Sequence, residues 1–204
     1  MAMSKANLFI LSGPSGSGKD TILKEALKRH PEIKLSISTI TRAMRQGEIE
    51  GEKYHFISRE EFEEQLSKDM FLEHNVFVGN YYGTPRGPVE ECLAAGTDMI
   101  VEIDVNGAKQ VKQKMPQAIS IFIMPPSFEV LKKRLSRRGT ESEELVAKRL
   151  GEAIREIKCA YDYDYIVIND DLDEAVEDLL SVILCERTKT VNNKKIIDEV
   201  LEKC

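Results

Sequence analysis

The stretch Gly13–Asp20 reads GPSGSGKD and decides the class of fold. It follows the apolar run LFIL at 8–11 and precedes a helical pattern over 21–29. Glycines at such a place let backbone N–H groups turn onto an anion, and the following helix adds the positive end of its dipole. The pattern Gly-x-x-x-x-Gly-Lys therefore predicts a phosphate-binding loop, in which Lys19 reaches the terminal phosphates of a nucleotide.

The last residue of this stretch departs from the usual pattern. A Ser or Thr normally follows the lysine and helps to hold Mg²⁺, whereas this chain has Asp20 there. Asp20 could be a helix N-terminal acid stabilised by the dipole, an oxygen ligand near Mg²⁺, or the mark of a relative that phosphorylates another acceptor. We favour the first interpretation, with Asp20 as at most an outer-shell metal partner, and Thr21 could offer a hydroxyl one position later.

Short apolar runs alternate with helical patterns along most of the 204 residues. This alternation of expected strands and helices predicts an α/β domain with a mainly parallel sheet. Strands are expected at 8–11, 35–40, 99–103, 119–124 and 165–168, and helices at 21–29, 60–67, 89–95, 128–137, 143–160 and 172–186. Turn signals and short aromatic segments from 38 to about 95 indicate a small β-rich insertion, and 188–204 is a polar tail that could hold a short helix.

Composition excludes several classes of protein. A chain with 42% apolar and 31% charged residues is typical of a soluble globular protein, and no apolar run approaches the length of a membrane-spanning helix. The net charge of −6 argues against non-specific nucleic-acid binding. We therefore expect neither membrane nor nucleic acid as a partner. Scattered cysteines indicate reduced thiols and a cytoplasmic location rather than a zinc cluster or disulfide framework: Cys92, Cys159, Cys185 and Cys204.

The insertion carries a second concentration of polar residues. Arg42 and Arg45 are three residues apart, so a turn could aim both guanidinium groups at one anion, although a solvated basic turn would show the same pattern. Of the neighbouring Tyr81 and Tyr82, one is expected to pack in the core.

Several segments of the chain occur in an informative order. They are Ser12–Lys19, Ser38–Arg45 with Gly47-Glu48, Gly51 and Tyr54, Phe71–Glu73, Gly79–Pro85, Ile103–Gly107, Arg137–Thr140 and Ile168–Asp171. Together they resemble the guanylate kinase family of ATP:GMP phosphotransferases over nearly the whole chain. The resemblance implies a P-loop NTPase fold, with a three-layer α/β/α parallel-sheet core, a β-rich GMP-binding insertion and a small helical lid. The domain would span 5–187, with the core at 5–37 and 97–187, the insertion at 38–96, the lid at about 134–150 and a tail at 188–204.

The resemblance also implies roles for individual residues. The GMP phosphate would be held by Arg42, Arg45, Tyr54 and Tyr82, and the guanine read by Ser38, Glu73, Thr84 and Asp104. ATP would lie on Gly13, Pro14, Ser15, Gly16, Ser17, Gly18, Lys19, Asp20 and Thr21, with Asn169 bordering the adenine. Catalysis would rest on Lys19, the lysine of the phosphate loop, and on three arginines that close over the transferring phosphoryl group: Arg134, Arg138 and Arg149.

A Mg²⁺ ion would accompany ATP as the cofactor. Its candidate partners are Asp20 or Thr21, together with Glu102 at the end of a core strand. Glu102 stands where the family usually has Asp, so the carboxylate moves by about one bond length. Asp20 is then a candidate for a compensating change.

The chemistry of Glu73 supports this assignment independently. Guanine presents its N1–H and 2-amino groups side by side, and one carboxylate can accept from both. Adenine offers a lone pair at N1 and no donor at C2, so AMP would leave that carboxylate unpaired. The alternative is that Glu73 is simply a solvated acid.

The predicted function is ATP-dependent phosphorylation of GMP, and of dGMP, in purine nucleotide metabolism. A ribose 1,5-bisphosphate phosphokinase is the first alternative, because that similar family often has Gly-Lys-Asp in its loop; it has no need of Glu73 and Asp104. A non-catalytic guanylate-kinase-like binding module is the second, and such modules usually lack the lysine that is present here as Lys19.

Overall fold

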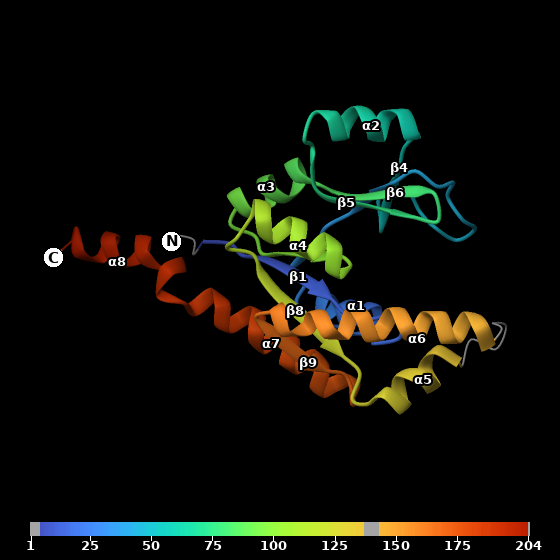
Figure 1. The fold of residues 1–204 in the computed structure, drawn as a ribbon. Helices are drawn as coiled ribbons and strands as arrows, with labels where there is room; N and C mark the ends of the chain where they lie inside the picture. The colour runs from blue at the N-terminus through green and yellow to red at the C-terminus, as the bar shows by residue number, and fades with distance from the viewer. Residues whose placement is uncertain (1–4, 137–142, 204) are drawn as a thin grey trace.

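A five-stranded parallel sheet forms the centre of the computed structural model, which describes residues 5–136 and 143–203 (Figure 1). Its strands lie in the order β2-β7-β1-β8-β9, and all neighbouring pairs are parallel. Their carboxyl ends therefore meet at one edge, where open parallel sheets commonly bind ligands. The predicted α/β class is confirmed. The strands are β1 (Leu8–Ser12), β2 (Lys34–Leu35), β7 (Met99–Glu102), β8 (Ile119–Met124) and β9 (Tyr165–Ile168).

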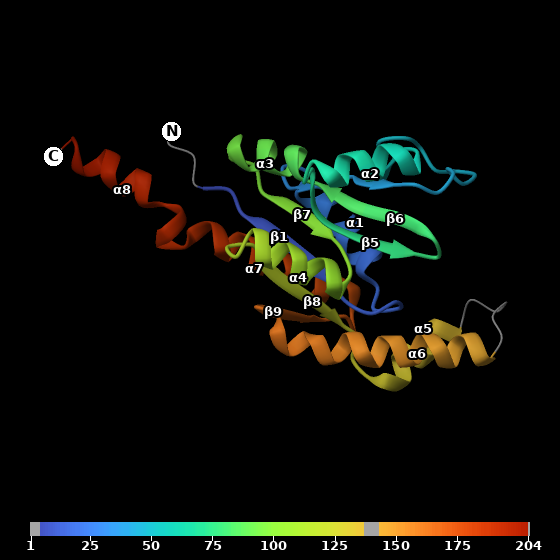
Figure 2. The ribbon, with the colours of Figure 1, turned by 45° about the horizontal axis from the view of Figure 1, so that its top comes forward.

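Helices cover both faces of this sheet and give three layers (Figures 1 and 2). They are α1 (Lys19–Arg29), α3 (Arg86–Ala94), α4 (Val105–Lys114) and α7 (Leu172–Thr188). On β1, Phe9 and Leu11 pack with α1 and α7, while Leu8 and Ile10 pack with α3 and α4. Successive side chains of a strand point to opposite faces, so a strand covered on both sides is apolar throughout. Helix α4 was not predicted, because Gly107 and several polar residues dilute its apolar pattern.

The inserted segment folds around a second sheet with the strand order β4-β3-β6-β5. Its strands are β3 (Ser38–Ile40), β4 (Tyr54–Phe56), β5 (Phe71–Phe77) and β6 (Asn80–Pro85). Helix α2 (Arg59–Ser67) covers this sheet by placing the Phe62 ring between those of Phe71 and Tyr81, with ring centroids 4.3 and 5.0 Å apart. Tyr81 is therefore the packing member of the Tyr81-Tyr82 pair, which leaves Tyr82 available to the site.

The single strand predicted at 35–40 is wrong. It is divided between the two sheets, because β2 ends with Leu35 paired to Ile100 in the core, whereas β3 begins with Ser38 paired to Tyr54 in the insertion. An apolar run shows that a segment is extended and buried, but not with which sheet each half pairs. The division marks the start of the inserted subdomain.

Two more helices lie beside the carboxyl edge of the core sheet, and a third ends the chain. They are α5 (Phe128–Ser136), α6 (Glu143–Lys158) and α8 (Lys194–Leu201), with 3-10 turns at Cys159–Asp162 and Thr190–Asn192. Leu131 and Leu135 of α5 pack on Ala153 of α6, while α8 extends away from the body (Figure 1). Among the helices within 5–136 and 143–203, none has the length and apolar character needed to cross a membrane.

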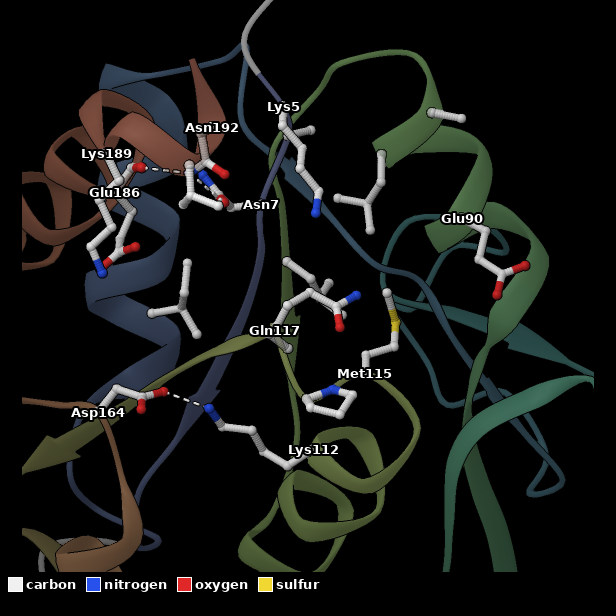
Figure 3. Close-up of a pocket in the computed structure, with 18 of the residues that line it drawn as sticks. Lys5, Asn7, Glu90, Lys112, Met115, Gln117, Asp164, Glu186, Lys189 and Asn192 are labelled. Carbon is white, nitrogen blue, oxygen red and sulfur yellow. Dashed lines mark hydrogen bonds and ion pairs between the residues drawn. The ribbon is translucent and has the colours of Figure 1, made fainter. Parts of the chain in front are cut away.

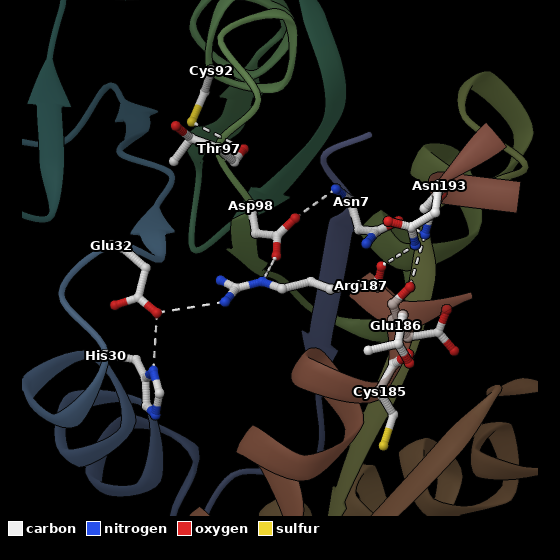
Figure 4. A network of polar contacts seen from close by, with 12 residues as sticks. Asn7, His30, Glu32, Cys92, Thr97, Asp98, Cys185, Glu186, Arg187 and Asn193 are labelled. Atoms are coloured by element: carbon white, nitrogen blue, oxygen red, sulfur yellow. Dashed lines mark hydrogen bonds and ion pairs between the residues drawn. The ribbon is translucent and has the colours of Figure 1, made fainter. Parts of the chain in front are cut away.

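A network of polar contacts fastens α7 to the amino-terminal edge of the core sheet (Figure 4). The Asp98 carboxylate accepts hydrogen bonds from the Asn7 backbone N–H at 2.7 Å and from Arg187 Nε. Arg187 also donates to Glu32 at 3.5 Å, and the hydrogen bond from His30 lowers the pKa of Glu32. The side chain of Asp98 is only 4% exposed, so Arg187 supplies the main charge that compensates its burial.

Replacing Arg187 with methionine is expected to lower the free energy of unfolding by about 3 kcal/mol, because it leaves a buried carboxylate without its counter-ion. Urea unfolding measures the change. Arg29→Met is the control, since Arg29 pairs with the exposed Asp173 and Glu177 and surface pairs contribute about 1 kcal/mol or less. Equal effects of the two substitutions would show that Asp98 does not need Arg187.

Candidate active site

The phosphate loop connects the carboxyl end of β1 to the first turn of α1. Gly18 has a φ of +92°, and a Cβ there would lie 2.1 Å from Asn169 Nδ2. A Cβ at Gly13 would lie 2.4 Å from the Ile123 carbonyl oxygen. Both positions therefore require glycine. Asn169 Nδ2 in turn donates to the Ser17 carbonyl at 2.6 Å, which fixes the loop against the end of β9.

A pocket of about 920 Å³ surrounds this loop. In Figures 1 and 2 the loop lies between the inserted sheet and the α5–α6 pair. The pocket is lined by the loop residues Gly13–Gly16 and Gly18–Thr21, by Lys53, Tyr54 and Phe77 of the insertion, by Glu102 at the end of β7 with Ile103 and Asp104 after it, and by Arg134, Glu156, Asn169, Asp170 and Leu172. The predicted ATP-binding residues other than Ser17 and two predicted GMP-binding residues, Tyr54 and Asp104, thus share one space.

Three of the four predicted catalytic cations contact the phosphate loop. Lys19 Nζ donates to the Gly13 carbonyl at 2.7 Å, and Arg149 donates to Ser15 Oγ at 2.7 Å. Arg134, in the last turn of α5, donates to the carbonyls of Ser17 and Asn169 at 3.4 and 3.0 Å. The fourth, Arg138, lies outside the described residues. The contacts of Arg134 hold it to the core side of the site.

The predicted guanine-reading residues gather where the insertion meets α4. Glu73 is only 5% exposed, and its Oε1 accepts a hydrogen bond from Thr84 Oγ1 at 2.7 Å. Burial, with a smaller contribution from the nearby Asp104 charge, raises the pKa of Glu73 to about 7. The solvated-acid alternative for Glu73 is therefore wrong.

Asp104 has a structural role in addition to its predicted role in binding guanine. Its Oδ1 caps α4 by accepting from the backbone N–H groups of Asn106 and Gly107 at 2.9 and 2.7 Å, and its Oδ2 accepts from Asn75 Nδ2. Sequence reasoning missed Asn75, which reaches Asp104 from β5. No local signal marks it, because the two residues are 29 positions apart.

The predicted phosphate clamp is built around the Glu48 carboxylate. Arg42 donates to both carboxylate oxygens, at 2.7 and 2.5 Å, and its guanidinium carbon lies 5.4 Å from the centre of the Tyr54 ring. The Arg42 hydrogen bonds lower the pKa of Glu48 to about 2. Arg45 donates its backbone N–H to Glu48 at 2.7 Å, while its side chain is exposed. Two guanidinium groups were predicted to point at one anion. Among the described contacts, only the Arg42 guanidinium hydrogen-bonds to the Glu48 carboxylate.

The remaining members of this set lie on the inserted sheet. Tyr82, on β6, pairs with Ile40 of β3, and its ring meets Phe77 edge-on with centroids 6.4 Å apart. Ser38, the first residue of β3, lines a small hollow together with Tyr54. The predicted acceptor residues thus come from all four strands of one small sheet, from the segment after β3 and from the cap of α4.

The candidate metal partners Asp20, Thr21 and Glu102 all line the pocket. Burial raises the pKa of Glu102, and Lys53 Nζ lies 3.6 Å from its Oε2 and 2.7 Å from Asp20 Oδ1. Within 5–136 and 143–203, no cluster of three or more His, Cys, Asp or Glu side chains could hold a metal ion by itself. Lys53 was not predicted; the signal for it was the unusual acid at Asp20, which attracts a nearby cation.

A second hollow, of about 820 Å³, opens at the opposite edge of the core sheet (Figure 3). Leu8, Ile119 and Tyr165 line it where their strands begin. Its Lys112 is already paired with Asp164 at 2.7 Å, as Figure 3 shows. Because it contains no residue of the phosphate loop, this hollow is not the candidate active site.

Comparison with known proteins identifies the family. A family model described as guanylate kinase matches residues 5–186. The chain belongs to the guanylate kinase family. It is 47% identical to the guanylate kinase of Desulfitobacterium hafniense (strain Y51), covering 93% of this chain and 94% of that one. It is 44% identical to the guanylate kinase of Escherichia coli (strain K12), covering 98% of each.

A solved structure places the fold in the same family. The crystal structure of guanylate kinase from Anaplasma phagocytophilum superposes with a TM-score of 0.76 at 34% identity, covering 93% of this chain and 90% of that one. The P-loop fold class and the assignment to the nucleoside monophosphate kinases are confirmed. The comparisons give no support to a ribose 1,5-bisphosphate kinase or to a non-catalytic binding module.

Proposed function

We propose that this chain transfers the γ-phosphoryl group of ATP to the phosphate of GMP, giving ADP and GDP, and that dGMP is also an acceptor. One observation carries this proposal: a single pocket is lined by the phosphate loop on one side and by Tyr54 and Asp104 on the other. Donor and acceptor phosphates could therefore meet in line, and phosphoryl transfer depends chiefly on such positioning and on charge neutralisation.

On the donor side, we assign the ATP phosphates to the backbone N–H groups of Gly13–Gly18 and to Lys19. The contact of Lys19 with the Gly13 carbonyl supports this role, since it keeps the ammonium group on the loop. Arg149 would complete the charge around the transferring group, because it reaches the loop at Ser15. Arg138 is assigned with it on the strength of the family motif alone, and Asn169 would border the adenine.

On the acceptor side, we assign the GMP phosphate to Arg42, Arg45, Tyr54 and Tyr82. The Nε of Arg42 is buried and has no hydrogen-bond partner among the described residues, so this guanidinium can still donate while it pairs with Glu48. The guanine is assigned to the carboxylate of Glu73, with Ser38, Thr84 and Asp104 around it. Thr84 orients the carboxylate by donating to one of its oxygens.

Mg²⁺ is the proposed cofactor. Asp20 and Glu102 both lie near the Lys53 ammonium group, so their oxygens approach one place beside the phosphate loop. This set fits the ion, since Mg²⁺ is usually held by one or two carboxylates together with substrate phosphates. Glu102 and either Asp20 or the Thr21 hydroxyl would hold it. When bound, the ion would neutralise phosphate charge and orient the phosphate oxygens.

We propose the cytoplasm as the location, with ATP and GMP as the partners rather than membrane or nucleic acid. The acidic balance of the chain supports this choice, since a net charge of −6 disfavours polyanions. Cys92, Cys159 and Cys185 are free thiols, as is usual in a reducing compartment.

A coupled assay of ADP release, run in parallel with four acceptors, tests the proposed function. GMP and dGMP are expected to be phosphorylated, whereas AMP and ribose 1,5-bisphosphate are expected to be inactive. The two poor acceptors test different sides of the proposal: AMP tests the guanine site, and ribose 1,5-bisphosphate tests the need for a base. Turnover of ribose 1,5-bisphosphate in preference to GMP would contradict the proposal.

The affinity for guanosine and GMP is expected to fall as the pH drops below about 7. Burial raises the pKa of Glu73 to about 7, and only its ionised form accepts from both guanine donors. The dissociation constant should therefore rise about tenfold per pH unit below that pKa and level off above it. Calorimetric titration between about pH 5.5 and about pH 8.5 measures how the dissociation constant depends on pH.

Guanosine is the critical ligand in this titration, because the phosphate of GMP itself titrates near pH 6. A profile for guanosine that stays flat through neutrality would show that the base does not bind the Glu73 carboxylate.

A further inference from the structure

Lys53 connects the inserted subdomain to the core. It precedes β4, and its Nζ lies 2.7 Å from Asp20 Oδ1 and 3.6 Å from Glu102 Oε2. Asp20 belongs to the first turn of α1, and Glu102 is the last residue of β7. One ammonium group of the subdomain therefore contacts carboxylates from two core elements beside the phosphate loop.

These three charged side chains differ in their exposure to solvent. The side chains of Asp20 and Lys53 are 75% and 51% exposed, whereas that of Glu102 is only 17% exposed. An ammonium group at this place neutralises acids that would otherwise face the phosphates of a nucleotide.

Asp20 makes this contact a specific feature of the chain. The usual residue after the loop lysine is Ser or Thr, whose hydroxyl would not attract an ammonium group as a carboxylate does. The acid on α1 and the lysine on the insertion therefore form a pair in which each compensates the other. The pair spans 33 residues and joins two structural units.

Asp20 and Glu102 are also the carboxylates proposed above to hold Mg²⁺, so a divalent cation would compete with Lys53 for them. We infer that Lys53 is a positioning residue: it ties the inserted subdomain to the phosphate loop until a Mg²⁺-nucleotide complex takes over Asp20 and Glu102. The release of Lys53 then allows the subdomain to move relative to the loop. This inference rests on the proposed placement of Mg²⁺.

Distance measurements between two spin labels test the coupling. The labels are placed at Glu60 on α2 and Asp178 on α7, both exposed, in a chain whose four native cysteines are replaced by serine. Without nucleotide, the wild type should give a narrow distribution that broadens or shifts when Mg²⁺-ADP is added. Lys53→Met should give the altered distribution before any addition, with little further response to Mg²⁺-ADP.

Two matched variants separate this role from a general loss of charge. Lys68→Met removes a lysine of the same subdomain that pairs within its own segment, with Glu64 at 2.7 Å, and should behave as the wild type. Lys53→Arg keeps the cation and should restore the response to Mg²⁺-ADP. Urea unfolding of each variant confirms that it is folded before its distances are compared.

Calorimetry of Mg²⁺-ADP binding gives a second readout. If the metal displaces Lys53, Lys53→Met should bind Mg²⁺-ADP roughly threefold more tightly than the wild type, as expected for a partly exposed ion pair. The gain should shrink in about 0.5 M salt and vanish in an Asp20→Ser background. A lysine that simply attracted phosphates would have the opposite effect, because its removal would weaken binding.

Unchanged distances in Lys53→Met, or binding of Mg²⁺-ADP that is equal to or weaker than that of the wild type, would overturn the inference. Neither readout uses GMP turnover. A chain that shows both expected responses but fails to phosphorylate GMP would therefore overturn the proposed function and leave the role of Lys53 standing.

Discussion

Replacing Lys19 with alanine is expected to reduce GMP turnover about a thousandfold or more, since a single well-placed charge at a transferring group commonly has an effect of this size. Lys19 Nζ lies on the phosphate loop, 2.7 Å from the Gly13 carbonyl. GMP binding should stay nearly intact, because the proposed ligands Arg42 and Glu73 belong to the insertion. Steady-state ADP release measures turnover, and calorimetry with GMP measures binding.

Lys24→Ala is the matched control for this experiment. Lys24 lies on the same helix, α1, but its side chain is exposed and outside the pocket, so its removal should leave turnover unchanged. Both variants remove one positive charge, so the comparison isolates the effect of where the lysine lies. If Lys19→Ala kept activity within tenfold of the wild type, the phosphate loop would have no place in the mechanism.

The parts of the fold that were predicted correctly depend on local rules. The loop Gly13–Asp20 is recognised because its glycines, lysine and flanking elements are adjacent in sequence. Strands such as Ile119–Met124 are recognised because burial on both faces makes every residue apolar. Each signal is complete within a few residues, so no knowledge of the tertiary structure is required.

Helix α4 was missed because its sequence serves a distant contact. Gly107 lowers helix propensity by about 1 kcal/mol relative to alanine. A Cβ at this position would, however, lie 2.7 Å from Glu73 Oε2, so the glycine allows the close approach of the carboxylate that we propose to bind guanine. The helix begins nonetheless, because Asp104 caps it, and its buried Val111 packs under the sheet. The Asp104 cap and the packing of Val111 therefore outweigh the low helix propensity of Gly107.

The partners of the proposed site residues were not predicted from the sequence. Arg42 and Asp20 were both identified, but the acid that holds Arg42 and the lysine that holds Asp20 were not. Glu48 and Lys53 became visible as partners only when the loop between β3 and β4 was placed against β3 and α1. A motif identifies groups that face the ligand, whereas the groups that orient them come from other segments.

Replacing Glu73 with glutamine is expected to reduce the preference for GMP over AMP about a thousandfold, measured as the ratio of their kcat/KM values. Glutamine keeps the size of the side chain but can accept from only one guanine donor, and its amide N–H would face the other. The kcat/KM for GMP should account for nearly all of the change. Thr84→Val, which removes the hydroxyl that orients Glu73 but keeps the carboxylate, should have a much smaller effect, about tenfold.

Stability measurements on Glu73→Gln distinguish a specific effect from unfolding. The pKa of Glu73 is raised from 4.5 to about 7, so its contribution to stability is fully present below pH 4.5 and is lost as the pH rises through about 7. Glutamine carries no charge to bury, and the variant should therefore be up to about 3 kcal/mol more stable than the wild type at high pH and nearly equal to it at low pH. A variant that unfolds more readily at every pH would instead place Glu73 among the residues that hold the fold together. A more stable protein that no longer distinguishes GMP from AMP would show that the buried carboxylate is kept for recognition at the expense of stability.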